Sequence, residues 1–258
     1  MLLQRPHFFW ISFGRGCSIL AASCLLTAPL DASERLTADQ EGRALAADLK
    51  LLRPIEGNGV LRLRNPAGKW FAEIPVRLRF MEQGDSWQSI YEAFTPEGLP
   101  AETLVVTGGL GRPNQYQHAV APATLGAPKS GAESNVPFAG SEFWLTDLGL
   151  EFLHWPTQQI VKREMRKGRA CRVLESVNPN PGQGYARVRS WVDSEHQTIL
   201  RAEAYDAAGK TLKEFSIGSF KKVPDASGKK RWQLKSMEIR NERNDARTRL
   251  EFDLELRD

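Results

Sequence analysis

Long stretches of the chain alternate between apolar and polar residues with a period of two. From Ile74 to Phe80, every second residue is apolar, and proline or arginine stands between. The stretch from Leu250 to Leu256 alternates in the same way with charged residues. Such alternation is typical of a strand with one face on a core and the other in water. The chain must therefore build a sheet whose apolar face has to be covered.

Turn signals separate these stretches at short intervals. They are Asn65–Gly68, Gly84–Asp85, Lys167–Gly168, Asp206–Gly209, Pro224–Gly228 and Asn244–Asp245. Short strands joined by hairpin turns predict a meandering antiparallel sheet, and no alternation of strands with helices suggests a parallel α/β fold. A sheet of this size has to curl to bury its apolar face. We therefore expect a mainly β fold in which a curved meander sheet forms a closed or half-open antiparallel β-barrel.

Two helical segments are expected to accompany the sheet. An N-terminal helix should begin at a capping box formed by Thr37 and Gln40 and end before Pro54. Its apolar stripe consists of Leu45, Leu49 and Leu52. A short helical lid is expected over residues 143–152, where Leu148 and Phe152 are four apart. Because the first helix has only one apolar stripe, it can cover only part of the sheet.

The beginning of the chain is typical of an export signal. Two arginines precede an uncharged run over residues 17–26, which is too short to span a membrane. We expect a signal peptide at residues 1–32, a single domain at residues 33–258, and a periplasmic location. Cys24 follows a sequence that loosely matches a lipoprotein-processing site, so lipid anchoring through Cys24 is the alternative.

Charge and cysteine content narrow the possible functions. The formal net charge of the chain is only +4, and no long basic block occurs, so nucleic acid is not expected as a partner. Cys171 is the single cysteine after the expected leader, which excludes an internal disulfide in the exported chain. Its strand-like surroundings predict a buried structural thiol.

Catalytic motifs are scarce in this sequence. It contains no His-x-x-x-His pair and no Gly-x-Ser-x-Gly elbow. The glycines of Gly108–Gly111 lack a following helix and a lysine, so we interpret this segment as a turn or bulge. Nothing singles out a paired-carboxylate site, although one stays open. We therefore expect no enzymatic activity, no metal and no cofactor.

Aromatic and leucine side chains crowd the segment between residues 138 and 155. We predict that the ligand-binding residues are Phe138, Phe143, Trp144, Leu148, Phe152 and Trp155. The competing interpretation is that these side chains fill the core of the sheet. Burial alone can hold an acyl chain, at about 0.8 kcal/mol per methylene. A protein of this kind needs no catalytic group.

Several segments after Phe138 carry motifs of one bacterial family. They are Gly140–Phe143 with Asp147–Leu148, Gly168–Glu175, Trp191–Asp193 with 200–210, and Met237 with Asn241 and Thr248. This half of the chain resembles the outer membrane lipoprotein-sorting protein family, whose fold is similar to the periplasmic carriers LolA and LolB. Glu142 stands where that family usually has Asp. The resemblance implies that residues 33–258 form a single LolA/LolB-like lipid-binding domain. Its fold would be a half-open antiparallel β-barrel with a short helical lid and a hydrophobic interior.

The resemblance also implies a function in handling lipids between membranes. Our hypothesis is a periplasmic carrier or binding protein for an acylated lipoprotein or another lipid, with acyl chains inside the barrel. An inner-membrane transporter and an outer-membrane acceptor would be its partners, and a monomer is expected. The alternative is a non-catalytic structural or interaction module of a cell-envelope complex, whose barrel is filled by its own side chains.

Overall fold

The structure, a computed structural model, describes residues 37–52, 56–109, 111–182, 184–224 and 230–253. The expected signal peptide, with Cys24, lies outside these residues, as do Leu254 and Leu256 of the last alternating stretch. No helix in the described part of the chain is long and apolar enough to cross a membrane.

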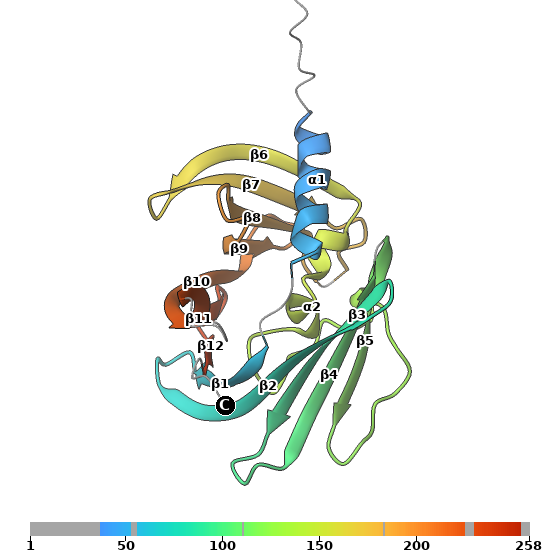
Figure 1. Ribbon diagram of the computed structural model, residues 1–258, viewed down its shortest axis with the longest axis vertical. Helices are drawn as coiled ribbons and strands as arrows, with labels where there is room; N and C mark the ends of the chain where they lie inside the picture. The colour runs from blue at the N-terminus through green and yellow to red at the C-terminus, as the bar shows by residue number, and fades with distance from the viewer. Residues whose placement is uncertain (1–36, 53–55, 110, 183, 225–229, 254–258) are drawn as a thin grey trace, which may run out of the picture. The chain divides into compact units, whose positions relative to one another are not determined.

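Twelve antiparallel strands form one open sheet. The strands are β1 (Gly57–Arg64), β2 (Trp70–Gln83), β3 (Ser86–Phe94), β4 (Pro100–Gly109), β5 (Arg112–Val120), β6 (Thr157–Arg166), β7 (Arg169–Val177), β8 (Arg187–Asp193), β9 (Ile199–Tyr205), β10 (Thr211–Pro224), β11 (Lys230–Asn241) and β12 (Arg247–Phe252). Their order is β5-β4-β3-β2-β1-β12-β11-β10-β9-β8-β7-β6, so the edge strands β5 and β6 do not pair with each other (Figure 1). The prediction of a mainly β, half-open meander is confirmed.

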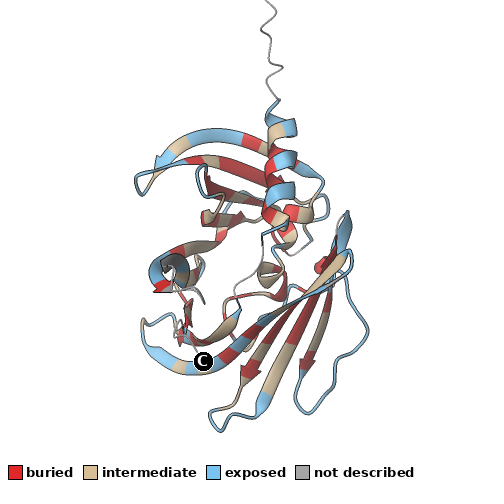
Figure 2. Ribbon diagram, viewed as in Figure 1, coloured by how far each residue is buried: buried red, intermediate tan, exposed pale blue. Residues whose placement is uncertain are grey.

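The period-two pattern decides which face of each strand is buried. In β2, Val76 and Leu78 are buried, whereas Arg77 and Arg79, which alternate with them, are exposed. In β12, every second residue is buried in the same way. Figure 2 shows the resulting mixture of buried and exposed positions along the strands. The buried positions form the inner face of the curved sheet.

The connection between the edge strands crosses the inner face. Strands β1–β5 and β6–β12 form two meanders joined by the pairing of β1 with β12. Residues 121–156, the crossing segment, must therefore run from one edge of the sheet to the other. They carry α2 (Leu145–Leu148) and η2 (Glu151–His154). Two short turns replace the single expected helical segment because Leu150 adopts a left-handed backbone conformation with φ 48°.

The N-terminal helix α1 (Ala38–Lys50) has the predicted capping box. The Thr37 hydroxyl accepts a hydrogen bond from the Gln40 amide at 3.2 Å, and the Thr37 amide donates to the Gln40 side chain at 2.7 Å. Leu45 and Leu49 are buried against η2 and the inner face of strands β6–β10. The helix thus covers one part of the sheet, as its single stripe predicts.

A glycine allows α1 to lie directly on strand β6. A Cβ added at Gly42 would lie 2.5 Å from the carbonyl oxygen of Gln158. Any larger residue at this position would push the helix away from the strand.

Two smaller predictions are also confirmed. Cys171 is a free, buried thiol in β7. A register shift between Thr107 and Gly109 places a bulge at the end of β4, where the glycine-rich segment begins.

Candidate ligand cavity

A cavity of about 650 Å³ lies on the inner face of the sheet. Helix α1, the crossing segment and strands β2, β3 and β8–β12 all contribute to its lining. Its aromatic and sulfur-containing residues include Tyr91, Phe143, Phe152, Phe215, Phe220 and Met237. The volume lies within the range of about 300–1,000 Å³ that is usual for small-molecule sites. The apolar lining favours an apolar ligand.

Small residues keep part of this space open. Ala202 and Ala204 line the cavity from β9, and both are buried. Strand alternation points these two side chains to the inner face, where a methyl group leaves room that a larger side chain would fill. The sheet therefore keeps an apolar hollow on its inner face.

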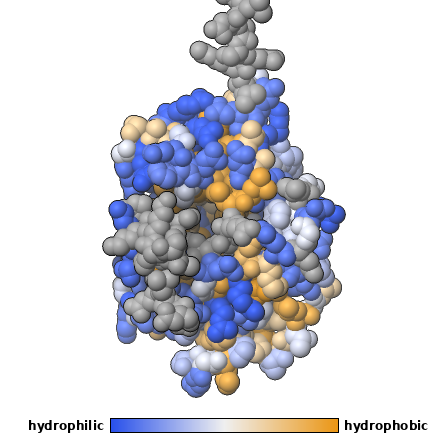
Figure 3. All heavy atoms as spheres, in the orientation of Figure 1, coloured by the Kyte–Doolittle hydropathy of each residue, from blue (hydrophilic) through white to orange (hydrophobic). Residues whose placement is uncertain are grey.

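The cavity reaches solvent near the end of α1. Leu52 lines the cavity and is 49% exposed, and Phe220 of β10 lines it and is 40% exposed. Figure 3 shows a mostly hydrophilic surface on which hydrophobic residues gather over the C-terminal end of α1. Apolar side chains therefore lie where the cavity meets solvent.

Three of the six predicted ligand-binding residues line the cavity. Phe143 and Phe152 are buried, and Leu148 is partly buried between them in the chain. They come from the crossing segment, which places them opposite the sheet. Their contact with a ligand stays a prediction.

The other three predicted residues lie beside the cavity, in the packing around it. Phe138 is 3% exposed and packs edge-on against Tyr91, with ring centroids 6.4 Å apart. Trp144 stacks on Tyr185 at 4.7 Å, and Trp155 packs against the cluster under α1. These side chains support the cavity wall, and their role toward a ligand also stays a prediction.

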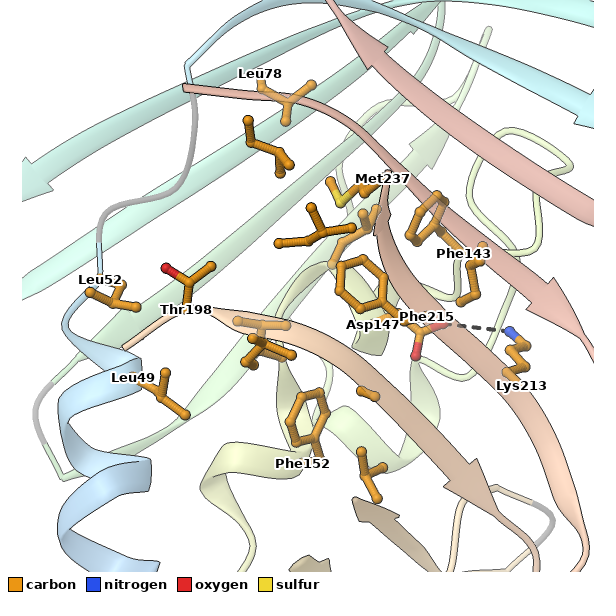
Figure 4. A pocket seen from close by; sticks show the side chains of 18 of the residues that line it. Leu49, Leu52, Leu78, Phe143, Asp147, Phe152, Thr198, Lys213, Phe215 and Met237 are labelled. Carbon is orange, nitrogen blue, oxygen red and sulfur yellow. Dashed lines mark hydrogen bonds and ion pairs between the residues drawn. The ribbon is translucent and has the colours of Figure 1, made fainter. Parts of the chain in front are cut away.

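One end of the cavity is polar. Asp147, Tyr185 and Lys213 line it, and Figure 4 shows Asp147 and Lys213 on the side of the cavity away from Leu52. Lys213 Nζ lies 3.4 Å from Asp147 Oδ2, and the Tyr185 hydroxyl donates a hydrogen bond to the same oxygen at 3.2 Å. Sequence reasoning missed this cluster.

Lys213 is an almost fully buried cation. Its ammonium group donates to the carbonyl oxygen of Glu142 at 2.6 Å and lies 3.8 Å from the ring centroid of Trp144. Burial lowers the pKa of Lys213, while the carboxylates of Asp147 and Glu142 act in the opposite direction. Burial also raises the pKa of Tyr185 well above its ordinary value, so its hydroxyl stays protonated and can donate.

The motif residues of the second half of the chain meet at this cluster. The amide of Glu142 donates to the Thr248 hydroxyl at 2.9 Å, and Asn241 donates to the Glu142 carboxylate at 3.0 Å. These bonds join the crossing segment to β11 and β12. Their residues are about a hundred positions apart in the chain, so spacing alone could not have predicted the contact.

Neutral donors hold the other side of the crossing segment. The Tyr91 hydroxyl donates to the carbonyl oxygen of Leu148 at 2.9 Å, and Asn114 donates to that of Gly149 at 2.7 Å. Tyr116 donates to the Glu151 carboxylate at 2.8 Å. The segment is therefore tied to strands β3 and β5 as well as to β10–β12.

Metal chemistry finds no support in this part of the molecule. Within the described residues, no group of three or more His, Cys, Asp or Glu side chains could hold a metal ion. At one end of the cavity, Asp147, Tyr185 and Lys213 are engaged with one another, and most of the lining is apolar. This arrangement is suited to binding an apolar ligand.

Comparison with known proteins identifies the fold. A family model described as an uncharacterized protein matches residues 127–255, half of the chain. No curated protein matches the sequence.

Solved structures resemble the chain over most of its length. A domain described as an outer membrane lipoprotein-sorting protein from Vibrio parahaemolyticus has a TM-score of 0.66 and 21% identity, covering 83% of this chain and 90% of that one. A DUF1329 family protein from Desulfovibrio piger has a TM-score of 0.64 and 18% identity, covering 86% and 96%. A LolA superfamily protein from Nitrosomonas europaea has a TM-score of 0.55 and 19% identity, covering 86% and 94%. The chain thus has the fold of lipoprotein-sorting and LolA-type proteins, as its motifs predict.

Proposed function

The chain belongs to the family of uncharacterized proteins whose model it matches, and we propose that it carries or binds the acyl chains of a lipoprotein or another lipid. The observation behind this proposal is the open apolar cavity on the inner face of the sheet. Its lining offers burial over several aromatic and aliphatic side chains, which is how an acyl chain is held. No catalytic step forms part of the proposal.

The cavity also distinguishes between the two functions that the sequence suggests, a lipid carrier and a structural or interaction module. A structural or interaction module would have its own side chains in this space. Here alanines lie on the floor of the cavity, and a half-exposed leucine lies at its mouth. We therefore favour the carrier over the filled module.

Transfer would follow from differences in affinity. A carrier of moderate affinity accepts its load from a weaker donor, such as an inner-membrane transporter, and gives it up to a tighter acceptor at the outer membrane. The domain at residues 33–258 would act alone, as a monomer. The exposed mouth near Leu52 and Phe220 is where such exchange would occur.

A binding experiment tests this proposal. The purified protein should bind a fluorescent C16 fatty acid and raise its emission, because the probe leaves water for the apolar cavity. The Ala202→Phe variant should weaken binding at least about tenfold, since the ring occupies the cavity. The control Ala208→Phe, in the exposed turn before β10, should bind as the wild type does.

Two results would contradict the proposal. One is the absence of probe binding together with no lipid in native mass spectra of the protein purified from cells. The other is equal binding by the Ala202→Phe and wild-type proteins, which would place the probe elsewhere.

We also propose export to the periplasm by the signal peptide at residues 1–32. Mass spectrometry of the mature N-terminus in cell fractions tests this. A soluble periplasmic chain that begins near residue 33 supports export as a free protein. A membrane-bound chain that begins with acylated Cys24 would instead establish the lipid-anchored alternative.

A further inference from the structure

The two carboxylate oxygens of Asp147 have different surroundings. Oδ2 accepts hydrogen bonds from the Trp144 amide at 2.8 Å, the Tyr185 hydroxyl at 3.2 Å and the Lys213 ammonium at 3.4 Å. No described residue donates to Oδ1. Because Asp147 lines the cavity, this oxygen is an acceptor available to whatever occupies that end. An apolar group that covered this oxygen would leave it without a donor, which is costly, so a ligand that supplies a donor gains affinity.

The donors at this end are already used by the protein. The Lys213 ammonium is engaged by the Glu142 carbonyl oxygen, by Asp147 and by the face of the Trp144 ring. The Tyr185 hydroxyl donates to Asp147. A ligand acceptor such as a carboxylate would find no free donor here, and it would approach the Asp147 carboxylate, which repels a second negative charge.

We infer that the ligand places a hydrogen-bond donor, a hydroxyl or an ammonium group, against Asp147 at the inner end of the cavity. This inference rests on the proposed function, because it assumes that the cavity holds an apolar chain. In Figure 4, Asp147 lies on the side of the cavity away from Leu52 and Thr198, with apolar side chains between. The ligand is therefore a chain with a polar group at its buried end and not a simple hydrocarbon tail.

A series of C16 fatty acids that differ only at the far end tests this inference. The ends are methyl, hydroxyl, ammonium and carboxylate, and each compound displaces the fluorescent fatty acid from the wild-type protein. We expect the hydroxyl and ammonium compounds to bind at least about tenfold more tightly than the dicarboxylate. Equal affinities for the ammonium and carboxylate ends would overturn the inference and leave the proposed function standing.

The Asp147→Asn variant replaces the acceptor at the Oδ1 position with a hydrogen-bond donor. Its amide oxygen can still accept from Trp144 and Tyr185, while its NH₂ group replaces the free oxygen. The preference for ammonium over carboxylate should fall at least about tenfold, with the methyl compound as the reference for intact binding. In the control Asp85→Asn, in the exposed turn between β2 and β3 and outside the cavity lining, the preference should be unchanged. An unchanged preference in Asp147→Asn also overturns the inference, and binding of no compound at all refutes it together with the proposed function.

Discussion

The crossing segment is held on its two sides by different chemistry. Toward β10–β12, the bonds involve a buried ammonium and two carboxylates, and Lys213 and Asp147 face the cavity. Toward β3 and β5, the neutral side, uncharged groups donate to two backbone carbonyl oxygens and to the Glu151 carboxylate. A charged pair loses much of its gain to desolvation, whereas bonds between neutral groups depend little on pH or salt. We therefore expect the neutral side to fix the segment and the charged side to respond to a ligand.

Removing the buried ammonium should cause the largest loss of stability. Lys213→Met leaves the Asp147 carboxylate without its cation and the Glu142 carbonyl oxygen without its donor, so we expect a loss of about 3–5 kcal/mol in the free energy of unfolding. Urea denaturation measures this loss. Lys210→Met, an exposed lysine in the preceding turn, is the matched control and should change stability by less than about 0.5 kcal/mol. A loss below about 1 kcal/mol for Lys213→Met would show that the charged side contributes no more than the neutral side.

A substitution on the neutral side should lower the free energy of unfolding by less and should not change ligand binding. Asn114→Leu has similar volume but leaves the Gly149 carbonyl oxygen without its 2.7 Å donor, so we expect a loss of about 1–3 kcal/mol. Asn114 does not line the cavity, and the affinity for the fluorescent fatty acid should stay within about twofold of the wild type. A much larger drop in affinity would mean that the neutral side also contributes to ligand binding.

The turn η2 should make stability depend on pH. Burial lowers the pKa of His154 from 6.5 to about 4, and the charge of Lys50 adds to this shift. Since the unfolded chain takes up the proton first, stability should fall as pH decreases from about 6.5 to about 4. With allowance for solvent access, the loss is about 1–2 kcal/mol.

The variant His154→Gln isolates this contribution. Urea denaturation at several pH values should give a shallower slope for the variant than for the wild type between pH 6.5 and 4. Burial raises the pKa of Glu151 in the same turn, and this shift acts in the opposite sense, with stability lost as pH rises. Identical slopes for wild type and variant would show that His154 titrates normally in the folded protein.

Local signals in the sequence predicted much of the fold. The capping box at Thr37, the alternation around Val76 and the buried thiol of Cys171 each depend on a few neighbouring residues, and the structure has all three. The family motifs predicted the open sheet in the same way. The split of the lid into two turns was missed because nothing near Leu150 indicates a left-handed residue.

The candidate site could be predicted only in part for a physical reason. Alternation shows which face of a strand is buried but not whether side chains from elsewhere fill the space above it. In the sequence, Lys213 looks like any other polar residue of a strand, and its partner Asp147 lies 66 positions earlier in the chain. Trp144 is aromatic and partly buried, yet its ring packs against Tyr185 and Lys213. Only the path of the crossing segment across the sheet brings these groups together.

The variant with the smallest expected loss of stability, Tyr91→Phe, gives the clearest contrast between the neutral and the charged side of the crossing segment. Tyr91→Phe removes only the hydroxyl that donates to the Leu148 carbonyl oxygen, so we expect a loss of about 0.5–1.5 kcal/mol. Burial raises the pKa of Tyr91, which keeps this donor neutral, and the loss should be the same at pH 5 and pH 8. The loss in Lys213→Met should instead depend on pH, because this variant leaves a charged carboxylate without its cation. Denaturation of both variants at the two pH values measures the contrast, and a pH-dependent loss in Tyr91→Phe would mean that the neutral side is coupled to the charged cluster after all.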